Sequence, residues 1–198
     1  MRFPSATHLV VMCRTRGEAE AALGRLTVLL AELGLQPKAA KTRIVHLTEG
    51  GEGFDFLGFH HRLVRARGRT GARRVLFLAR WPATKAMQHA RDRLRQLTQR
   101  SRLRLPVDLI VQEINMFLRG WAGYFRYGNS ARHFDKIRAH ALGRLALFMA
   151  KRHQRSRAWG WSLVAYASPD NLGLISLNGA VIAPRPNRPW KATAEHRR

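Results

Sequence analysis

The second half of this chain contains three consecutive amphipathic segments, which limit its fold more than any other feature. In each segment apolar residues recur every three or four positions, the spacing of one face of an α-helix. Pro82 and Pro106 fit the first turns of the first two helices, and Gly128-Asn129-Ser130 fits a stop followed by the N-cap of the third. Because the connections are short, the pattern predicts an antiparallel three-helix bundle. The three stripes are Ala83, Ala86, Met87, Ala90, Leu94 and Leu97; Ile110, Ile114, Phe117, Leu118, Trp121 and Phe125; and Phe134, Ile137, Ala141, Leu145, Phe148 and Met149.

The first 80 residues have a different pattern, with short apolar runs around one helix. Thr15 and Glu18 fit the N-terminal capping box of a helix over residues 16–33, and Gly34 fits its end. Short apolar runs predict strands at residues 9–13, 42–47, 54–60 and 75–78. The whole chain therefore belongs to the α+β class, and we divide it into a mixed unit (residues 1–80), a helical unit (residues 81–160) and a C-terminal extension (residues 161–198) that we expect to be partly mobile.

The charge of the chain points to its partner. The formal net charge of the 198 residues is +24, and residues 61–105 alone have a net charge of +13, against +1 for residues 1–60. Thirty of the 36 basic residues are arginines, whose guanidinium groups form two hydrogen bonds with one phosphate. Because a free chain with this charge repels itself, we expect a polyanionic partner.

The composition argues against several other classes of protein. The single cysteine, Cys13, excludes a disulfide framework and a cysteine-based zinc module. No apolar run approaches the ~20 residues of a membrane span, and residues 1–8 are too short and polar for a secretory signal. We therefore expect a protein of a reducing compartment with no membrane partner, and we assign it to the cytoplasm of a bacterium. The acidic residues include no adjacent pair at a strand end, which a two-metal catalytic site would favour, so we predict no catalytic residue and no metal ligand.

Arginines, aromatic residues and glycines alternate over residues 119–130. Trp121 and Phe125 are four residues apart and fit the core of the bundle. Arg119 and Arg126 flank small residues that would let a nucleic acid backbone approach closely, so we expect them to contact phosphates. Farther on, His133 and His140 have cationic neighbours, which favour surface or RNA-facing positions over metal binding.

Two groups of motifs resemble one protein family, and they follow each other along the chain in the same order as in that family. Ile114-Asn115-x-x-Leu118-Arg119-Gly120-Trp121-x-x-Tyr124-Phe125-x-x-Gly128-Asn129-Ser130 resembles the maturase-specific domain of group II intron-encoded proteins. Leu33-Gly34-Leu35, Lys41-Thr42-Arg43-Ile44 and Gly53-Phe54-Asp55-Phe56-Leu57-Gly58-Phe59 resemble the last palm motifs of the reverse transcriptases that precede this domain. The resemblance covers about residues 8 to 175. It implies a partial reverse-transcriptase palm followed by a helical thumb, or X domain, that holds RNA.

One departure from the family concerns its enzyme activity. The family has Tyr-Ala-Asp-Asp before the strand that matches residues 9–13, and here Thr7 and His8 stand in place of the two metal-binding aspartates. Neither supplies an anionic oxygen at neutral pH, and the fingers and earlier palm are absent. The resemblance thus implies a truncated member of an RNA-directed DNA polymerase family without its own polymerase site. We expect no cofactor on this chain, and Mg²⁺ on the RNA or in a complete polymerase.

The sequence therefore predicts a protein that binds group II intron RNA and assists splicing. Two further readings stay open: the C-terminal half of a split reverse transcriptase that works on an RNA/DNA template-primer with a separate N-terminal half, and a decayed remnant. A general basic module for DNA or anionic membranes is a further alternative. The resemblance places Lys41 and Thr42 near phosphates. The full set of predicted RNA contacts is Lys41, Thr42, Arg73, Arg74, Arg91, Arg95, Arg119, Arg126, Asn129, Arg132 and Arg138.

Overall fold

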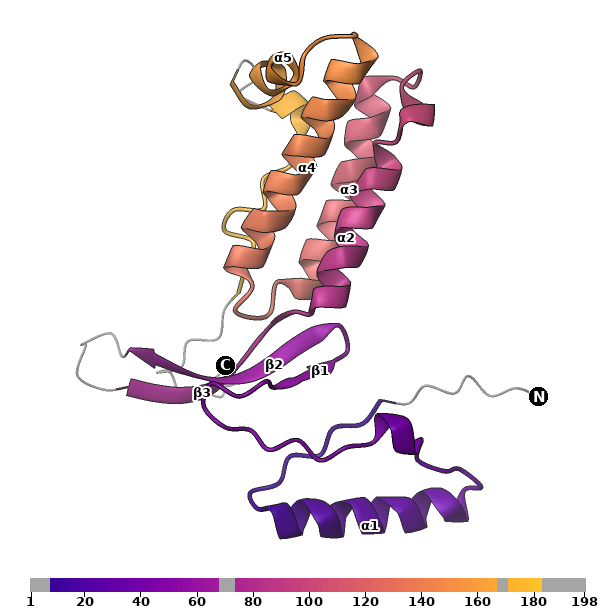
Figure 1. Cartoon of the computed structure of the whole chain (residues 1–198), viewed down its shortest axis with the longest axis vertical. Coiled ribbons are helices and arrows are strands. Elements are labelled where there is room, and N and C mark those ends of the chain that lie inside the picture. Colours follow the sequence, from indigo (N-terminus) through magenta and orange to yellow (C-terminus); the bar gives the residue numbers. More distant parts are fainter. Residues whose placement is uncertain (1–7, 68–73, 167–170, 183–198) are drawn as a thin grey trace, which may run out of the picture.

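The computed structural model describes residues 8–67, 74–166 and 171–182. Three long helices stand side by side as a bundle, a three-stranded antiparallel sheet lies at one end of it, and a further helix lies beyond the sheet (Figure 1). The bundle helices are α2 (Thr84–Leu97), α3 (Val107–Phe125) and α4 (Ala131–Arg152), and the separate helix is α1 (Arg16–Glu32). This mixture of helices and an antiparallel sheet is compatible with the predicted α+β class.

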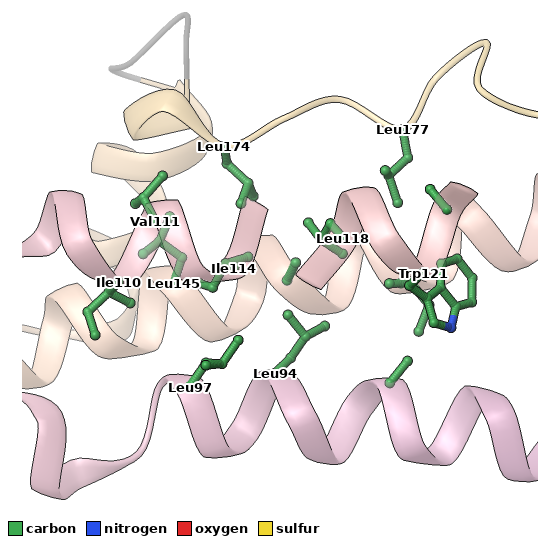
Figure 2. Close-up of a cluster of buried hydrophobic side chains, with 14 of the residues drawn as sticks. Leu94, Leu97, Ile110, Val111, Ile114, Leu118, Trp121, Leu145, Leu174 and Leu177 are labelled. Atoms are coloured by element: carbon green, nitrogen blue, oxygen red, sulfur yellow. The ribbon is translucent and has the colours of Figure 1, made fainter. Parts of the chain in front are cut away.

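The predicted stripes form the core of the bundle. Leu94, Ile114, Ile137 and Leu145 are fully buried, and Ala86 and Phe117 are the stripe members that stay half-buried. In Figure 2, Leu94 points from α2 toward α3. Since each fully buried aliphatic side chain contributes about 1.5–3 kcal/mol, the three stripes hold the bundle together.

The sheet consists of β1 (Phe54–Phe56), β2 (Phe59–Arg67) and β3 (Arg74–Pro82), in that order. The single strand predicted over residues 54–60 is wrong, because a two-residue turn at Leu57 and Gly58 divides it into β1 and the start of β2. Both turn residues have positive φ, +46° and +76°, the conformation of the tight turn that joins two twisted strands.

The third strand is longer than the sequence predicted. It runs to Pro82, so this proline ends a strand and does not stand in the first turn of α2. Ala83 takes the N-cap position of α2 instead. Strand β3 thus leads directly into the bundle.

The N-terminal part of the chain contains no buried residue within residues 8–47. Helix α1 has the predicted ends: the Thr15 hydroxyl accepts a hydrogen bond from the Glu18 amide at 3.2 Å, and the amide of Gly34 donates to the carbonyl of Ala31 at 3.0 Å. The strands predicted at residues 9–13 and 42–47 are wrong, since both segments are irregular. Neither segment has a partner strand there, and backbone groups without one cannot form a sheet.

The segment after the bundle packs back onto it. It contains α5 (Arg157–Trp161), a π-helical turn (Ser162–Tyr166), a short 3₁₀ turn η4 (Asn171–Gly173) and an extended stretch to residue 182. Leu174 and Leu177 are buried against α3, on the side opposite α2 (Figure 2). This part of the predicted extension therefore completes the core. Two further 3₁₀ turns are η1 (Ala39–Lys41) and η2 (Arg100–Arg102).

A buried asparagine of α3 fixes this returning segment. The Asn115 side-chain amide donates to the carbonyl of Gly173 at 2.8 Å and its oxygen accepts from the amide of Ile175 at 2.9 Å. One side chain thus satisfies two backbone groups of a segment that has no partner strand. Among the residues that the structure describes, no helix is long and apolar enough to cross a membrane.

Candidate nucleic-acid interface

Helices α2 and α4 bring basic side chains together along the line where they pack. Arg91 and Arg95 of α2 and His140 and Arg144 of α4 are close enough for their charges to influence one another, and we call these four residues the α2–α4 seam. The Arg144 guanidinium donates from Nε to the Thr98 hydroxyl at 2.9 Å and from Nη2 to the Thr98 carbonyl at 3.1 Å. This pair of bonds caps the C-terminal end of α2 and joins it to α4.

Positive charges predominate in the α2–α4 seam. Burial, followed by repulsion from Arg95, lowers the pKa of the Arg144 guanidinium. Burial, followed by repulsion from Arg95, Arg144 and Arg91, also holds the pKa of His140 below its ordinary value of 6.5, although a backbone hydrogen bond with Arg91 opposes this. An anion placed here would relieve these repulsions.

One carboxylate lies beside the seam, and it is already bonded. Asp92 accepts from Arg95 Nη1 at 2.6 Å and from the Gln88 amide at 2.9 Å. The Gln88 hydrogen bond and the bonds and charge of Arg95 lower the pKa of Asp92, so the carboxylate stays ionised at neutral pH. The seam contains three arginines, Arg91, Arg95 and Arg144, and Asp92 offsets one of their charges. A net excess of about two positive charges therefore remains.

Helix α3 differs sharply from α2 and α4. It contains Asp108, Glu113 and one basic residue, Arg119. Glu113 is occupied by a two-pronged ion pair with Arg102 of η2, both N···O distances being 2.7 Å. The basic character of the bundle therefore lies on α2 and α4, not on the helix that carries the arginine–aromatic motif.

The arginine–aromatic motif of residues 119–130 divides into two roles. Trp121 and Phe125 are buried, as predicted, and Arg119 and Arg126 are exposed. Arg126 lies over the ring of Tyr127, with 5.5 Å between its Cζ atom and the ring centroid. The two arginines are therefore open to a ligand.

Asn129 and its neighbour join the bundle to the sheet. The Asn129 amide donates to the carbonyl of Arg80 at 2.7 Å, and its side-chain oxygen accepts from the Arg80 amide at 3.4 Å. A Cβ atom at Gly128 would lie 2.7 Å from the same carbonyl oxygen, so this position accepts only glycine without a shift. Tyr124 strengthens the joint with a 2.8 Å hydrogen bond to the carbonyl of Leu57. Asn129, which we expected at the RNA, thus has a structural contact that the sequence did not predict.

The other predicted contact residues are spread over the molecule. Arg132 is exposed at the start of α4 and Arg138 is half-buried farther along it. Lys41 and Thr42 are exposed at η1, on the α1 side of the sheet, and the Thr42 hydroxyl donates to the carbonyl of Lys38 at 3.1 Å (Figure 1). Of the predicted set, the structure brings Arg91 and Arg95 together, and it keeps Lys41 and Thr42 away from the bundle.

The remaining positions from the sequence analysis are Thr7, His8, Arg73 and Arg74. Arg73 and Thr7 lie outside the described residues, and Arg74 is described only as the first residue of β3. His8, the other residue at the family's aspartate positions, is exposed.

Sequence reasoning missed Arg144 and the central place of His140. The sequence does contain a signal, since Arg132, Lys136, His140 and Arg144 recur every fourth residue along α4. Such residues form a continuous row with a rise of about 6 Å per step. The row passes from the exposed Arg132 to the half-buried Arg144.

The donor groups of the described residues do not form a metal centre. Throughout residues 8–67, 74–166 and 171–182, no group of three His, Cys, Asp or Glu side chains is close enough to hold a metal ion. The nearest approach to a catalytic pair is His60 with Asp55, whose Nδ1 and Oδ1 atoms are 2.7 Å apart on neighbouring strands of the β1–β2 hairpin.

Part of the chain matches a known protein family. Residues 87–167 match the family described as the group II intron, maturase-specific domain. The matched range begins inside α2 and includes α3, α4 and α5, so it covers most of the bundle. A search of the curated proteins returns no match to the chain.

Proposed function

We propose that this chain binds intron RNA through the basic face of its bundle, because residues 87–167 match the group II intron maturase-specific domain, which fits a role in group II intron splicing. In this proposal the chain assists splicing and carries no polymerase site of its own. RNA backbones are polyanions, and arginine binds phosphate with paired hydrogen bonds.

The observation that carries the proposal is the α2–α4 seam. Three arginines and a histidine gather there beside one carboxylate that is already hydrogen-bonded. The exposed basic residues of the α4 row extend the seam toward the sheet. Contacts of this kind fix the position of an RNA backbone without reading its sequence.

The chemistry of splicing belongs, in this proposal, to the RNA and its Mg²⁺. Among the residues that the structure describes, no group of three His, Cys, Asp or Glu side chains is placed to hold a metal ion. The work of the protein is electrostatic: its guanidinium groups offset phosphate repulsion as RNA helices pack closely. The rigid joint at Asn129 and Tyr124 would keep the sheet in a fixed position relative to this face.

The salt dependence of RNA binding tests the proposal. A site that neutralises ~6–8 phosphates gives a slope of log K against log salt of roughly −4 to −7. We expect such a slope with structured intron RNA, and weaker binding to duplex DNA and anionic vesicles at equal salt. Binding of intron RNA that hardly changes with salt would contradict the electrostatic mechanism.

Charge reversal at the motif separates binding from folding. Arg119→Glu with Arg126→Glu should weaken RNA binding without reducing helix content, because both side chains are exposed. An equal loss of binding and of folding would show that these arginines stabilise the bundle instead.

A second candidate function is the C-terminal half of a split reverse transcriptase. Its specific support is the exposed apolar surface of the N-terminal part: Leu9, Val11 and Met12 are each more than half exposed in an irregular segment. A partner with a free sheet edge would cover this segment. Primer extension on mixing with an N-terminal reverse-transcriptase half would support this function, and no extension in a stable complex would exclude it.

A further inference from the structure

We propose that the α2–α4 seam is a phosphate site in which His140 takes up a proton when an RNA phosphate binds, so that RNA binding strengthens as the pH falls. The inference rests on the proposed function and deepens it by adding a regulation of the same site. Its basis is the geometry of one half-buried imidazole among arginines.

The first observation is an unsatisfied ring nitrogen. The Nε2 atom of His140 is buried and has no hydrogen-bond partner in the structure. A buried polar atom without a partner is unfavourable by about 1–3 kcal/mol in general, so such an atom in a native protein calls for an explanation. A protonated imidazole carries a proton on both ring nitrogens. Because Nε2 is buried, a phosphate at the exposed Arg95 side chain favours that proton through its charge and not through a direct hydrogen bond.

The second observation is the charge around the ring. Helix α2 presents Arg91 and Arg95, and α4 presents Arg144 one turn after His140 and Lys136 one turn before it. Asp92, bonded to Arg95 and Gln88, is the carboxylate beside this group. Burial and the three arginines lower the pKa of His140, so the imidazole is neutral in the free protein at neutral pH.

A bound phosphate reverses this balance. Arg91 is half-buried and the Arg95 side chain is 50% exposed, so a phosphodiester can bind at Arg95 without opening the bundle. Its negative charge offsets the repulsion that kept the imidazole neutral, and the pKa of His140 rises. A group that gains a proton on binding makes binding stronger at lower pH, by the linkage between the two equilibria.

Another histidine of α4 provides an internal contrast. His133 also has its pKa lowered by burial, but its cationic neighbour is Lys136 alone and its ring stacks on Trp81 at 6.1 Å. A phosphate at Arg95 therefore affects His140 more than His133. His89, which is exposed on α2, serves as the matched control.

The experiment measures the affinity for structured intron RNA between pH 8 and pH 5.5 at constant ionic strength. Uptake of one proton increases affinity by at most about tenfold per pH unit, and a rise of about one unit in the pKa of His140 gives a total gain of about tenfold. We expect this gain in the unmodified chain and in His89→Gln. His140→Gln should lose most of this gain.

A second readout does not depend on a variant. In an NMR titration the imidazole of His140 should have a pKa below 6.5 in the free protein and a higher one in the RNA complex. Equal pH dependence in His140→Gln and the unmodified chain, or a pKa of His140 that RNA leaves unchanged, would overturn the inference while leaving RNA binding intact. A loss of affinity in His140→Gln that is the same at every pH would show a structural role and also overturn it. Failure of the unmodified chain to bind intron RNA at low salt would instead contradict the proposed function.

Discussion

The N-terminal part of this chain and its helical bundle contain similar apolar patterns and reach very different structures. Residues 8–47 include a well-capped helix and several leucines and valines, yet none of these residues is buried. The bundle buries nearly every residue of its three stripes. The difference shows that an apolar pattern can predict a helix, but that the apolar side chains are buried only where another element packs against them.

The two regions also differ in charge. The bundle concentrates its positive charge on α2 and α4, while residues 1–60 have a net charge of +1. The bundle therefore combines the buried core with a concentration of positive charge, and residues 8–47 have neither. The experiments below compare the two regions in stability and in RNA binding.

The largest expected effect comes from a matched pair of leucines. Leu94 is fully buried, whereas Leu29 on α1 is 57% exposed. Leu94→Ala should reduce the free energy of unfolding by about 3–5 kcal/mol, and Leu29→Ala should change it by less than about 0.5 kcal/mol. Urea unfolding of both variants checks this, and similar losses would mean that α1 packs in solution as tightly as the bundle.

A pair of glycines gives a smaller contrast. A Cβ atom at Gly160 of α5 would lie 2.1 Å from the carbonyl oxygen of Ala146 on α4, whereas one at Gly24 of α1 would have no atom within 4 Å. Gly160→Ala should destabilise the bundle by about 1–3 kcal/mol. Gly24→Ala should stabilise α1 by about 0.5–1 kcal/mol. Thermal unfolding and helix content by circular dichroism measure both, and a tolerated Gly160→Ala would contradict the close contact between α5 and α4.

The smallest effect expected is a dependence of bundle and sheet stability on pH. Burial is the main cause that lowers the pKa of His61, His133 and His140. Since the unfolded chain binds protons to these groups more readily, the free energy of unfolding should fall as the pH drops below about 6.5. Urea titrations at pH 7.5 and 5.5 measure the change, and His140→Gln should reduce it. Greater stability at pH 5.5 would contradict the burial of these rings.

The bundle could be predicted from the sequence because each of its helices is buried on one side. A one-sided helix has a regular stripe, and Ile114 or Leu145 can be assigned to the core from spacing alone. The same reasoning failed at residues 54–60, where a segment rich in phenylalanine hides a turn that has positive φ at Leu57 and Gly58. It failed again at residues 9–13, because a strand needs a partner that local pattern does not reveal.

The candidate site was predictable only in part, for a related reason. Arg91 and Arg95 stood out as basic residues off the apolar stripe of their helix. His140 lies beside them because of the way α2 packs on α4. The spacing of residues within a single helix does not reveal this packing. The hydrogen bonds of Asn129 to Arg80 join residues 49 positions apart along the chain, so a residue that resembles a ligand contact has a structural role as well.

The most direct test of the account removes two arginines from each region. Arg91→Gln with Arg95→Gln and Arg25→Gln with Arg43→Gln change the net charge equally, and Arg25 and Arg43 are exposed in the N-terminal part. Since each charged hydrogen bond contributes about 1.5–3 kcal/mol, the seam pair should weaken intron RNA binding by about tenfold or more, and the N-terminal pair by about twofold at most. Equal losses for the two pairs would mean that RNA responds to overall charge and not to the α2–α4 seam.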